Sequence, residues 1–149
     1  MAILEFSLDL PSQPNQLMKL SEDYENLPKY LPDQLKSVRI IEKNETETIT
    51  EETIVFITLL KRNIVQQASH IKNNDNQLIT EIISGPAKGT KIITLFEKND
   101  SGSRVSFQLD LKLNLKAKIL QPLIIKYYKM VLTSVLYKMN THIIELESK

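Results

Sequence analysis

The feature that most constrains the fold is a long amphipathic stretch at residues 117–147. Apolar side chains recur there every three or four residues, the spacing that forms one face of an α-helix. Pro122 falls in or near the first turn, where a missing N–H is tolerated, and neither Pro nor Gly follows it. The pattern predicts one helix about 45 Å long. Its apolar face comprises Leu120, Ile124, Tyr127, Tyr128, Val131, Val135, Met139, Ile143 and Leu146, and its other side carries mostly Lys118, Lys126, Lys129, Asn140 and Glu147.

A helix of this length needs a broad partner, and alternating strands provide one. Residues 2–10 alternate apolar and polar side chains and predict a half-buried strand that ends at Pro11. Residues 14–20 then predict a short helix, and Ser21 is placed to cap a second one that Pro28 and Pro32 limit. Two short helices are therefore expected after the first strand.

The clearest strand covers residues 104–115, with unbroken alternation that implies one buried and one solvated face. Its apolar positions are Val105, Phe107, Leu109, Leu111, Leu113 and Leu115. Five further strands are predicted between turn signals such as 73–76, 85–86 and 99–102. They cover residues 38–41, 46–60, 63–71, 77–84 and 90–97.

The predicted fold class is therefore α+β. An antiparallel sheet of about six or seven strands, a size that curls as it twists, is expected to wrap around the long C-terminal helix. The sequence contains no repeat, low-complexity segment or linker, so residues 1–149 are predicted to form one domain.

Composition excludes several classes of protein. The formal net charge of +1 and the scattered lysines predict no binding of nucleic acid. The absence of Cys excludes disulfides and thiolate chemistry. The first residues lack the basic region of a signal peptide, and no apolar run approaches the length of a membrane span. We expect a cytoplasmic protein, and no feature of the sequence indicates an oligomeric state.

The order of elements resembles the helix-grip fold of the START-like, or SRPBCC, superfamily, which includes polyketide cyclase/dehydrase-like and coenzyme Q-binding proteins. Three stretches carry the likeness: residues 24–32, 85–90 and 96–113. The resemblance implies a cavity between sheet and long helix that holds lipids, hormones, polyketides or other apolar molecules. Some members of the superfamily catalyse cyclisation or dehydration, and many have no known activity, so the resemblance does not decide between binding and catalysis.

The size of such a cavity is limited by its energetic cost. A dry void of about 500 Å³ would cost roughly 12 kcal/mol, which is comparable to the stability of a whole domain. Water, ligand or side chains must therefore fill it, and four Phe with no Trp provide limited aromatic filling. We predict a modest, elongated apolar cavity. Its expected ligand-binding walls are Phe107, Leu109, Leu111 and Leu113 on the strand, with Ile124, Tyr128, Val131 and Val135 on the helix.

No catalytic set, metal site or cofactor motif is evident. His70 and His142 lack the partners and spacing of a metal site, and a structural or solvent-facing role is favoured for both. At least one of Tyr127 and Tyr128 is expected to face the sheet, where core packing is favoured over contact with a ligand. Phosphate-loop, dinucleotide and nucleophile-elbow motifs are missing, so we expect no cofactor.

The acidic residues are expected on solvated strand faces, with Glu45, Glu47, Glu51 and Glu52 forming one cluster. Pairing on the outer face is also favoured for Glu81; an inward Glu81 would be a buried carboxyl with a raised pKa and a candidate acid.

Three functions compete on this evidence. The leading hypothesis is a non-enzymatic binding or carrier protein for a hydrophobic small molecule such as a lipid, an isoprenoid or a polyketide-like compound. The second is a cyclase or dehydratase that uses Glu81, Tyr128 or His142 as an acid or base. The third is a module for a protein or for transient membrane-surface contact, slightly supported by Lys118, Lys126 and Lys129, although a solvated helix face is the favoured interpretation of these lysines.

Overall fold

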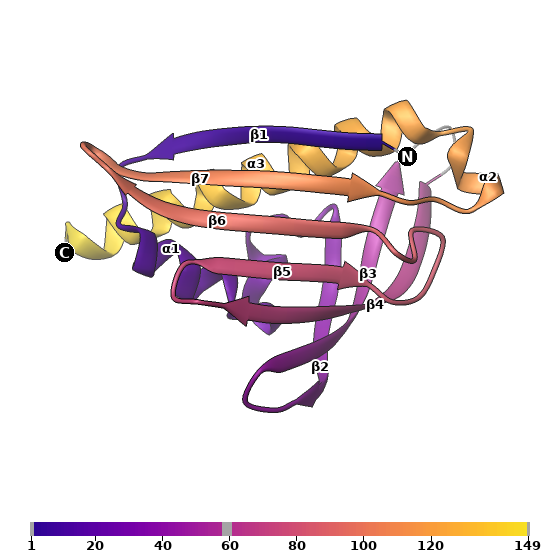
Figure 1. Cartoon of the computed structure of the whole chain (residues 1–149), viewed down its shortest axis with the longest axis horizontal. Helices are drawn as coiled ribbons and strands as arrows, with labels where there is room; N and C mark the ends of the chain where they lie inside the picture. The colour runs from indigo at the N-terminus through magenta and orange to yellow at the C-terminus, as the bar shows by residue number, and fades with distance from the viewer. Residues whose placement is uncertain (1, 58–60, 149) are drawn as a thin grey trace.

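A computed structural model describes residues 2–57 and 61–148 as a curved sheet around one long helix (Figure 1). Seven antiparallel strands pair in the order β1-β7-β6-β5-β4-β3-β2, which confirms the predicted meander and places β1 beside β7. The strands are β1 (Ala2–Leu10), β2 (Leu35–Lys43), β3 (Glu47–Ile57), β4 (Lys61–Asn73), β5 (Gln77–Ile82), β6 (Lys91–Asn99) and β7 (Gly102–Leu111). The helices are α1 (Pro14–Ser21), the 3-10 helix η1 (Tyr24–Lys29), α2 (Leu115–Lys118) and α3 (Gln121–Glu147).

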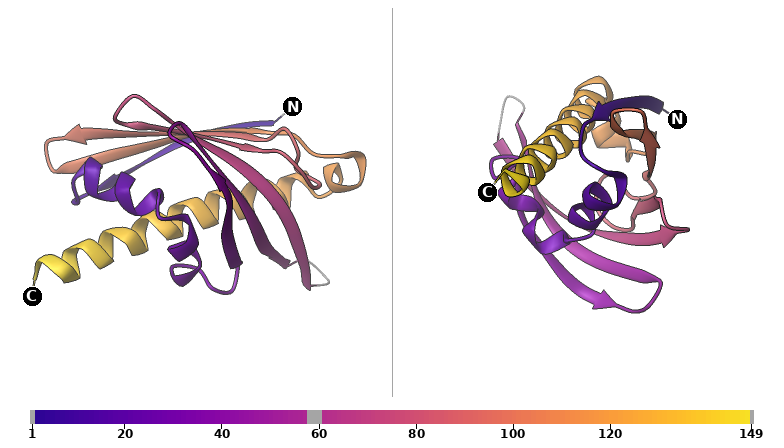
Figure 2. Two further views of the ribbon diagram at one scale, coloured as in Figure 1. Left: turned by 90° about the horizontal axis from the view of Figure 1, so that it is seen from below. Right: turned by 90° about the vertical axis from the view of Figure 1, so that its left-hand side faces the viewer.

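The long helix α3 crosses the concave side of the sheet, and α1 and η1 cover the part of that side which α3 leaves open (Figure 2). This arrangement is the predicted helix-grip fold. The four inward side chains of β7 are buried as the alternation predicts: Val105, Phe107, Leu109 and Leu111. They join Leu17 and Met18 of α1 and Val135, Leu136, Met139 and Ile143 of α3 in one core cluster.

The strand predicted for residues 104–115 is shorter in the structure, because β7 ends at Leu111. The hydroxyl of Thr90 donates to the Lys112 carbonyl oxygen and accepts from the Lys112 N–H, both at 3.0 Å. A side chain thus takes the place of the ladder partner, and the pairing stops. Leu113 lies just beyond the strand and Leu115 begins α2, so the alternation continues in sequence after the strand has ended.

The single helix predicted for residues 117–147 is wrong at its start, since α2 and α3 are separate helices. The side chain of Asn114 caps α2 by accepting a hydrogen bond from the Ala117 N–H at 2.8 Å. Pro122 lies in the first turn of α3, as predicted. A continuous helix would place the Pro122 ring against the carbonyl of Lys118, and this clash explains the break.

Three smaller predictions are also corrected. Ser21 does not cap η1; it ends α1, and its hydroxyl donates to the Leu17 carbonyl oxygen at 2.8 Å. Asn140, expected on the wet side of α3, is buried and accepts hydrogen bonds from Ser12. Leu146, expected on the apolar face, is exposed. The end of the strand predicted for residues 46–60 lies outside the described residues from 58 onward.

Candidate functional site

A cavity of about 570 Å³ lies between β3 and β4 on one side and α2 with the start of α3 on the other. Ile54, Phe56 and Ile64 form the sheet wall, and Ile124, Tyr127 and Tyr128 form the helix wall. The remaining lining residues are Arg62, Asn63, Gln66, Pro86, Ala87, Leu113, Asn114, Lys116, Ala117 and Leu120. Several of these are solvent-exposed, namely Arg62, Asn63, Asn114, Lys116 and Leu120, so the cavity opens to solvent on their side.

The eight residues predicted to bind ligand separate into two groups. Leu113, Ile124 and Tyr128 line the cavity. The other five lie in or against the main core: Phe107, Leu109, Leu111 and Val135 are buried in it, and Val131 packs against it half-buried. The cause is α1, which packs against β7 and α3 and inserts Leu17 and Met18 where an elongated cavity was expected. A role in ligand binding stays a prediction for all eight.

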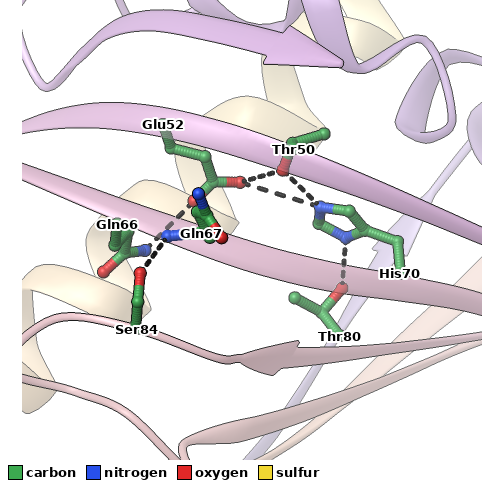
Figure 3. A network of polar contacts seen from close by, with 7 residues as sticks. All are labelled: Thr50, Glu52, Gln66, Gln67, His70, Thr80 and Ser84. Atoms are coloured by element: carbon green, nitrogen blue, oxygen red, sulfur yellow. Dashed lines mark hydrogen bonds and ion pairs between the residues drawn. The ribbon is translucent and has the colours of Figure 1, made fainter. Parts of the chain in front are cut away.

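A cluster of polar side chains occupies the concave face beside this cavity (Figure 3). Its members are Thr50 and Glu52 on β3, Gln66 and His70 on β4, and Thr80 on β5. Strand pairing brings them together, because Glu52 is the direct partner of Gln66 and His70 is the direct partner of Thr80. Facing side chains on paired strands lie within hydrogen-bonding reach. Gln66 belongs to both the cluster and the cavity wall.

His70 is the centre of the hydrogen bonds in this cluster. Its Nε2 atom lies 2.9 Å from the Thr50 hydroxyl, and its Nδ1 atom lies 2.8 Å from the Thr80 hydroxyl. The Tyr24 ring stacks on the imidazole with ring centres 4.2 Å apart. Burial lowers the pKa of His70 to about 4, so the ring is neutral at neutral pH. The favoured prediction of a structural histidine agrees with this environment.

Glu52 departs from the predicted exposed acidic cluster, because its side chain points inward. Its carboxylate accepts from the Gln66 amide at 3.0 Å and from the Thr50 hydroxyl at 3.2 Å. Burial raises the pKa of Glu52, while these two hydrogen bonds act to lower it. A sequence signal for this orientation exists: Glu52 shares the period-two face of Ile54 and Phe56, which the alternation places inward.

Tyr127 and Tyr128 of α3 both face the sheet and line the cavity. The Tyr127 hydroxyl donates to the Gln34 carbonyl oxygen at 3.1 Å, and the Phe56 ring meets the Tyr127 ring edge-on at 5.3 Å. Burial raises the pKa of Tyr127 to about 12. Burial also raises the pKa of Tyr128, and the nearby Glu52 adds to this shift. Both phenols therefore stay protonated at neutral pH.

The other candidates lie away from the cavity. Glu81 is exposed on the outer face of β5, opposite Ser69 and Lys91, as the favoured prediction stated. His142 is partly buried near the C-terminal end of α3, with the Tyr30 ring edge-on at 6.4 Å. Neither side chain lines the cavity, so neither is an acid or base for chemistry inside it. Among residues 2–57 and 61–148, no group of three or more His, Asp or Glu side chains is placed to hold a metal ion.

A match to a protein family covers most of the fold, from the end of β1 into α3. A sequence model of the family described as polyketide cyclase / dehydrase and lipid transport matches residues 10–140. The chain belongs to this family. The START-like, or SRPBCC, resemblance that the sequence indicated is thereby confirmed. No curated protein matches this member of the polyketide cyclase / dehydrase and lipid transport family in sequence.

Solved structures share the fold of this family member along nearly its whole length. A protein of Thermus thermophilus is 16% identical, with a TM-score of 0.81 over 97% of this chain and 99% of that one. The Zhui aromatase/cyclase from Streptomyces sp. R1128 is 8% identical, with a TM-score of 0.81 over 95% of each chain. A START superfamily protein from Mycobacterium smegmatis is 12% identical, with a TM-score of 0.77 over 97% of this chain and 98% of that one. At these identities the likeness shows the fold alone.

No helix in the described part of this family member is long and apolar enough to cross a membrane.

Proposed function

We propose that the chain binds an apolar small molecule in the cavity between β3, β4 and the start of α3. The observation that carries this proposal is the cavity itself, whose volume of about 570 Å³ falls within the range of small-molecule sites. Aliphatic and aromatic side chains from both the sheet and the helix form most of its walls. Transfer of apolar surface from water to such walls provides the favourable free energy of binding.

Gln66 gives the cavity a polar point at which a ligand can be oriented. Its amide nitrogen donates to Glu52, so the carbonyl oxygen is directed away from the carboxylate (Figure 3). That oxygen accepts hydrogen bonds and donates none. The ligand class that fits is therefore an apolar molecule with one hydroxyl or N–H donor. Isoprenoid alcohols and phenolic, polyketide-like rings both meet this description.

A carrier role is favoured over catalysis by the chemistry of the walls. None of the described cavity-lining residues is Asp, Glu or His. The buried carboxyl of Glu52 lies beside Gln66 and is held by two hydrogen bonds. The phenols of Tyr127 and Tyr128 also lie at the wall, and their raised pKa values keep both protonated. Of the three residues named for the cyclase or dehydratase hypothesis, Glu81, Tyr128 and His142, the described cavity lining includes Tyr128 only.

Native mass spectrometry of the purified protein, followed by organic extraction, tests the proposal first. The expected result is one bound apolar molecule per chain. If purification has removed the natural ligand, incubation of the protein with a lipid and quinone extract should restore binding of one apolar molecule per chain. A protein that takes up nothing from that extract contradicts the proposal. Any compound found then becomes the substrate for a turnover assay with Tyr128→Phe.

Variants that fill the cavity locate the site. Ile124→Trp from the helix wall and Ala87→Leu from the opposite wall are each expected to weaken binding of the extracted compound at least tenfold. Tyr137→Trp introduces the same side chain on an exposed position of α3 and is the matched control. Thermal unfolding by circular dichroism checks that each variant folds. Unchanged affinity in both folded cavity variants would place the ligand elsewhere.

A further inference from the structure

We infer that the segment joining β7 to α3 docks on an anionic lipid bilayer, with the mouth of the cavity at the docking surface. The surface comprises Leu115, Ile119 and Leu123 with Lys116, Lys118 and Lys126, and is called the mouth surface below. Docking itself is independent of the proposed ligand. The direct passage of a ligand between bilayer and cavity rests on the proposed function.

The apolar half of the mouth surface is unusually exposed. Leu115 is 86% exposed and Ile119 is 82% exposed, while Leu123 is 48% exposed. Helix α2 forms the tip of the molecule at the end opposite the C-terminus (Figures 1 and 2). Single exposed apolar residues are ordinary, but a contiguous group on a projecting turn marks an interaction site.

The charged half of the surface identifies the partner. Residues 111–144 contain six of the chain's 19 basic residues and none of its 18 acidic residues. The nearly neutral net charge of the whole chain hides this local excess of lysine. Lys116, Lys118 and Lys126 are all exposed within or beside the apolar group. Lysines around exposed leucine and isoleucine match a bilayer interface that contains anionic lipid, because the apolar side chains enter the acyl boundary and the ammonium groups meet headgroup phosphates.

Apolar and basic residues of the mouth surface are neighbours on α3. Leu123 and Lys126 are three residues apart on α3 and therefore lie side by side on the helix. Lys129 lies elsewhere, since its ammonium group is 5.5 Å from the centre of the Phe6 ring. Lys129 is therefore excluded from the mouth surface, although the sequence pattern grouped it with Lys118 and Lys126.

The same segment forms the rim of the cavity. Lys116, Ala117 and Leu120 line the cavity. The exposed Leu115 and Ile119 lie next to them in the sequence of α2 and the following turn. A bilayer in contact with Leu115 and Ile119 would thus face the open side of the cavity. An apolar molecule could then pass between acyl chains and cavity walls without full exposure to water.

Vesicle flotation tests the inference with the full chain. Wild-type protein is expected to float with phosphatidylcholine vesicles that contain phosphatidylserine and not with phosphatidylcholine alone. Binding should fall strongly between about 0.1 M and 1 M salt, where the Debye length shrinks from about 10 Å to about 3 Å. Equal binding to both kinds of vesicle, or no binding to either, would overturn the inference.

Two double variants separate the apolar and charged contributions. Leu115→Ser with Ile119→Ser, and Lys118→Glu with Lys126→Glu, are each expected to lower vesicle partitioning at least tenfold. Single controls on α3, away from the mouth surface, are Leu146→Ser, at a position 59% exposed, and Lys138→Glu. These controls should partition like the wild type. A loss of binding in the controls equal to that in the double variants would contradict a local surface.

Two further measurements distinguish the remaining outcomes. Uptake of the extracted compound from solution without vesicles should be unchanged in Leu115→Ser with Ile119→Ser, since these side chains do not line the cavity. Failure of uptake in the wild type would contradict the proposed ligand site and leave the vesicle result standing. Sedimentation of the wild type is expected to give a monomer. A dimer that this double variant dissociates would assign the surface to a second copy of the chain and overturn the inference.

Discussion

The Nε2 atom of His70 lies 3.7 Å from the Oε2 atom of Glu52, yet the two side chains do not form an ion pair at neutral pH. Burial lowers the pKa of His70 to about 4, so the imidazole is uncharged above that pH. The hydroxyls of Thr50 and Thr80 occupy both ring nitrogens of His70. Glu52 is held by Gln66 and Thr50 instead.

The neutral state of His70 predicts a loss of stability in acid. The unfolded chain binds a proton at His70 near its ordinary pKa of 6.5, whereas the folded chain does so only near 4. As the pH falls through this interval, the unfolded state binds a proton that the folded state does not. The free energy of unfolding therefore decreases by about 3 kcal/mol in total. Urea unfolding at several pH values should show this decrease in the free energy of unfolding.

The variant His70→Gln should remove most of that pH dependence while lowering stability at neutral pH. His142→Gln is the matched control and should leave the dependence in place. If the free energy of unfolding of His70→Gln decreased in acid by as much as that of the wild type, a group other than His70 would cause the decrease.

Glu52 acts in the opposite direction. Because its pKa is raised in the folded protein, its contribution to stability is fully present below the ordinary value of 4.5 and is lost as the pH rises through the folded value. Glu52→Gln keeps an acceptor for Gln66 and removes the buried charge. The wild type loses stability as Glu52 ionises at higher pH, and the variant does not. The free energy of unfolding of Glu52→Gln minus that of the wild type should therefore increase from acid to about pH 8. A constant difference across this pH range would contradict the prediction, and Glu51→Gln, at a half-buried position on the other face of β3, is the control.

The hairpin between β6 and β7 depends on a backbone contact at Gly102. Its φ of +145° disfavours any side chain, and a Cβ atom there would meet the Leu10 carbonyl oxygen and lie 2.6 Å from the Pro11 carbonyl. Both obstacles are backbone atoms that cannot rotate away. Gly102→Ala should therefore destabilise the protein by about 3 kcal/mol, whereas the neighbouring Ser101→Ala should change stability by less than about 0.5 kcal/mol. Equal midpoints of thermal unfolding would refute the steric argument.

Side-chain periodicity was sufficient to predict the sheet and the buried face of β7. Alternation depends on local backbone geometry, so Val105, Phe107, Leu109 and Leu111 are placed correctly by sequence alone. The same rule applied to β3 would also have turned Glu52 inward with Ile54 and Phe56. The sequence-based prediction instead grouped Glu52 with the neighbouring acidic residues, because charged side chains usually face solvent.

The position of the cavity could not be predicted in this way. It depends on how deeply α1 inserts Leu17 and Met18 between β7 and α3, and on the break at residues 119–120 that turns α2 outward. The end of β7 and the burial of Asn140 on α3 depend on hydrogen bonds between distant residues. Thr90 with Lys112 is one such pair, and Ser12 with Asn140 is another. The periodic pattern of apolar residues in a sequence does not reveal which distant residues form such hydrogen bonds.

The contact between Ser12 and Asn140 joins the two ends of the chain and predicts a measurable loss. The Asn140 Oδ1 atom accepts from the Ser12 N–H at 3.1 Å and from the Ser12 hydroxyl at 2.6 Å, and both residues are buried. Asn140→Ala leaves two buried donors unsatisfied, so we expect the free energy of unfolding to fall by about 2 kcal/mol. Thr141→Ala, on the adjacent exposed position, should have a much smaller effect. Urea unfolding of both variants decides this, and equal stabilities would mean that water replaces the Asn140 oxygen without cost.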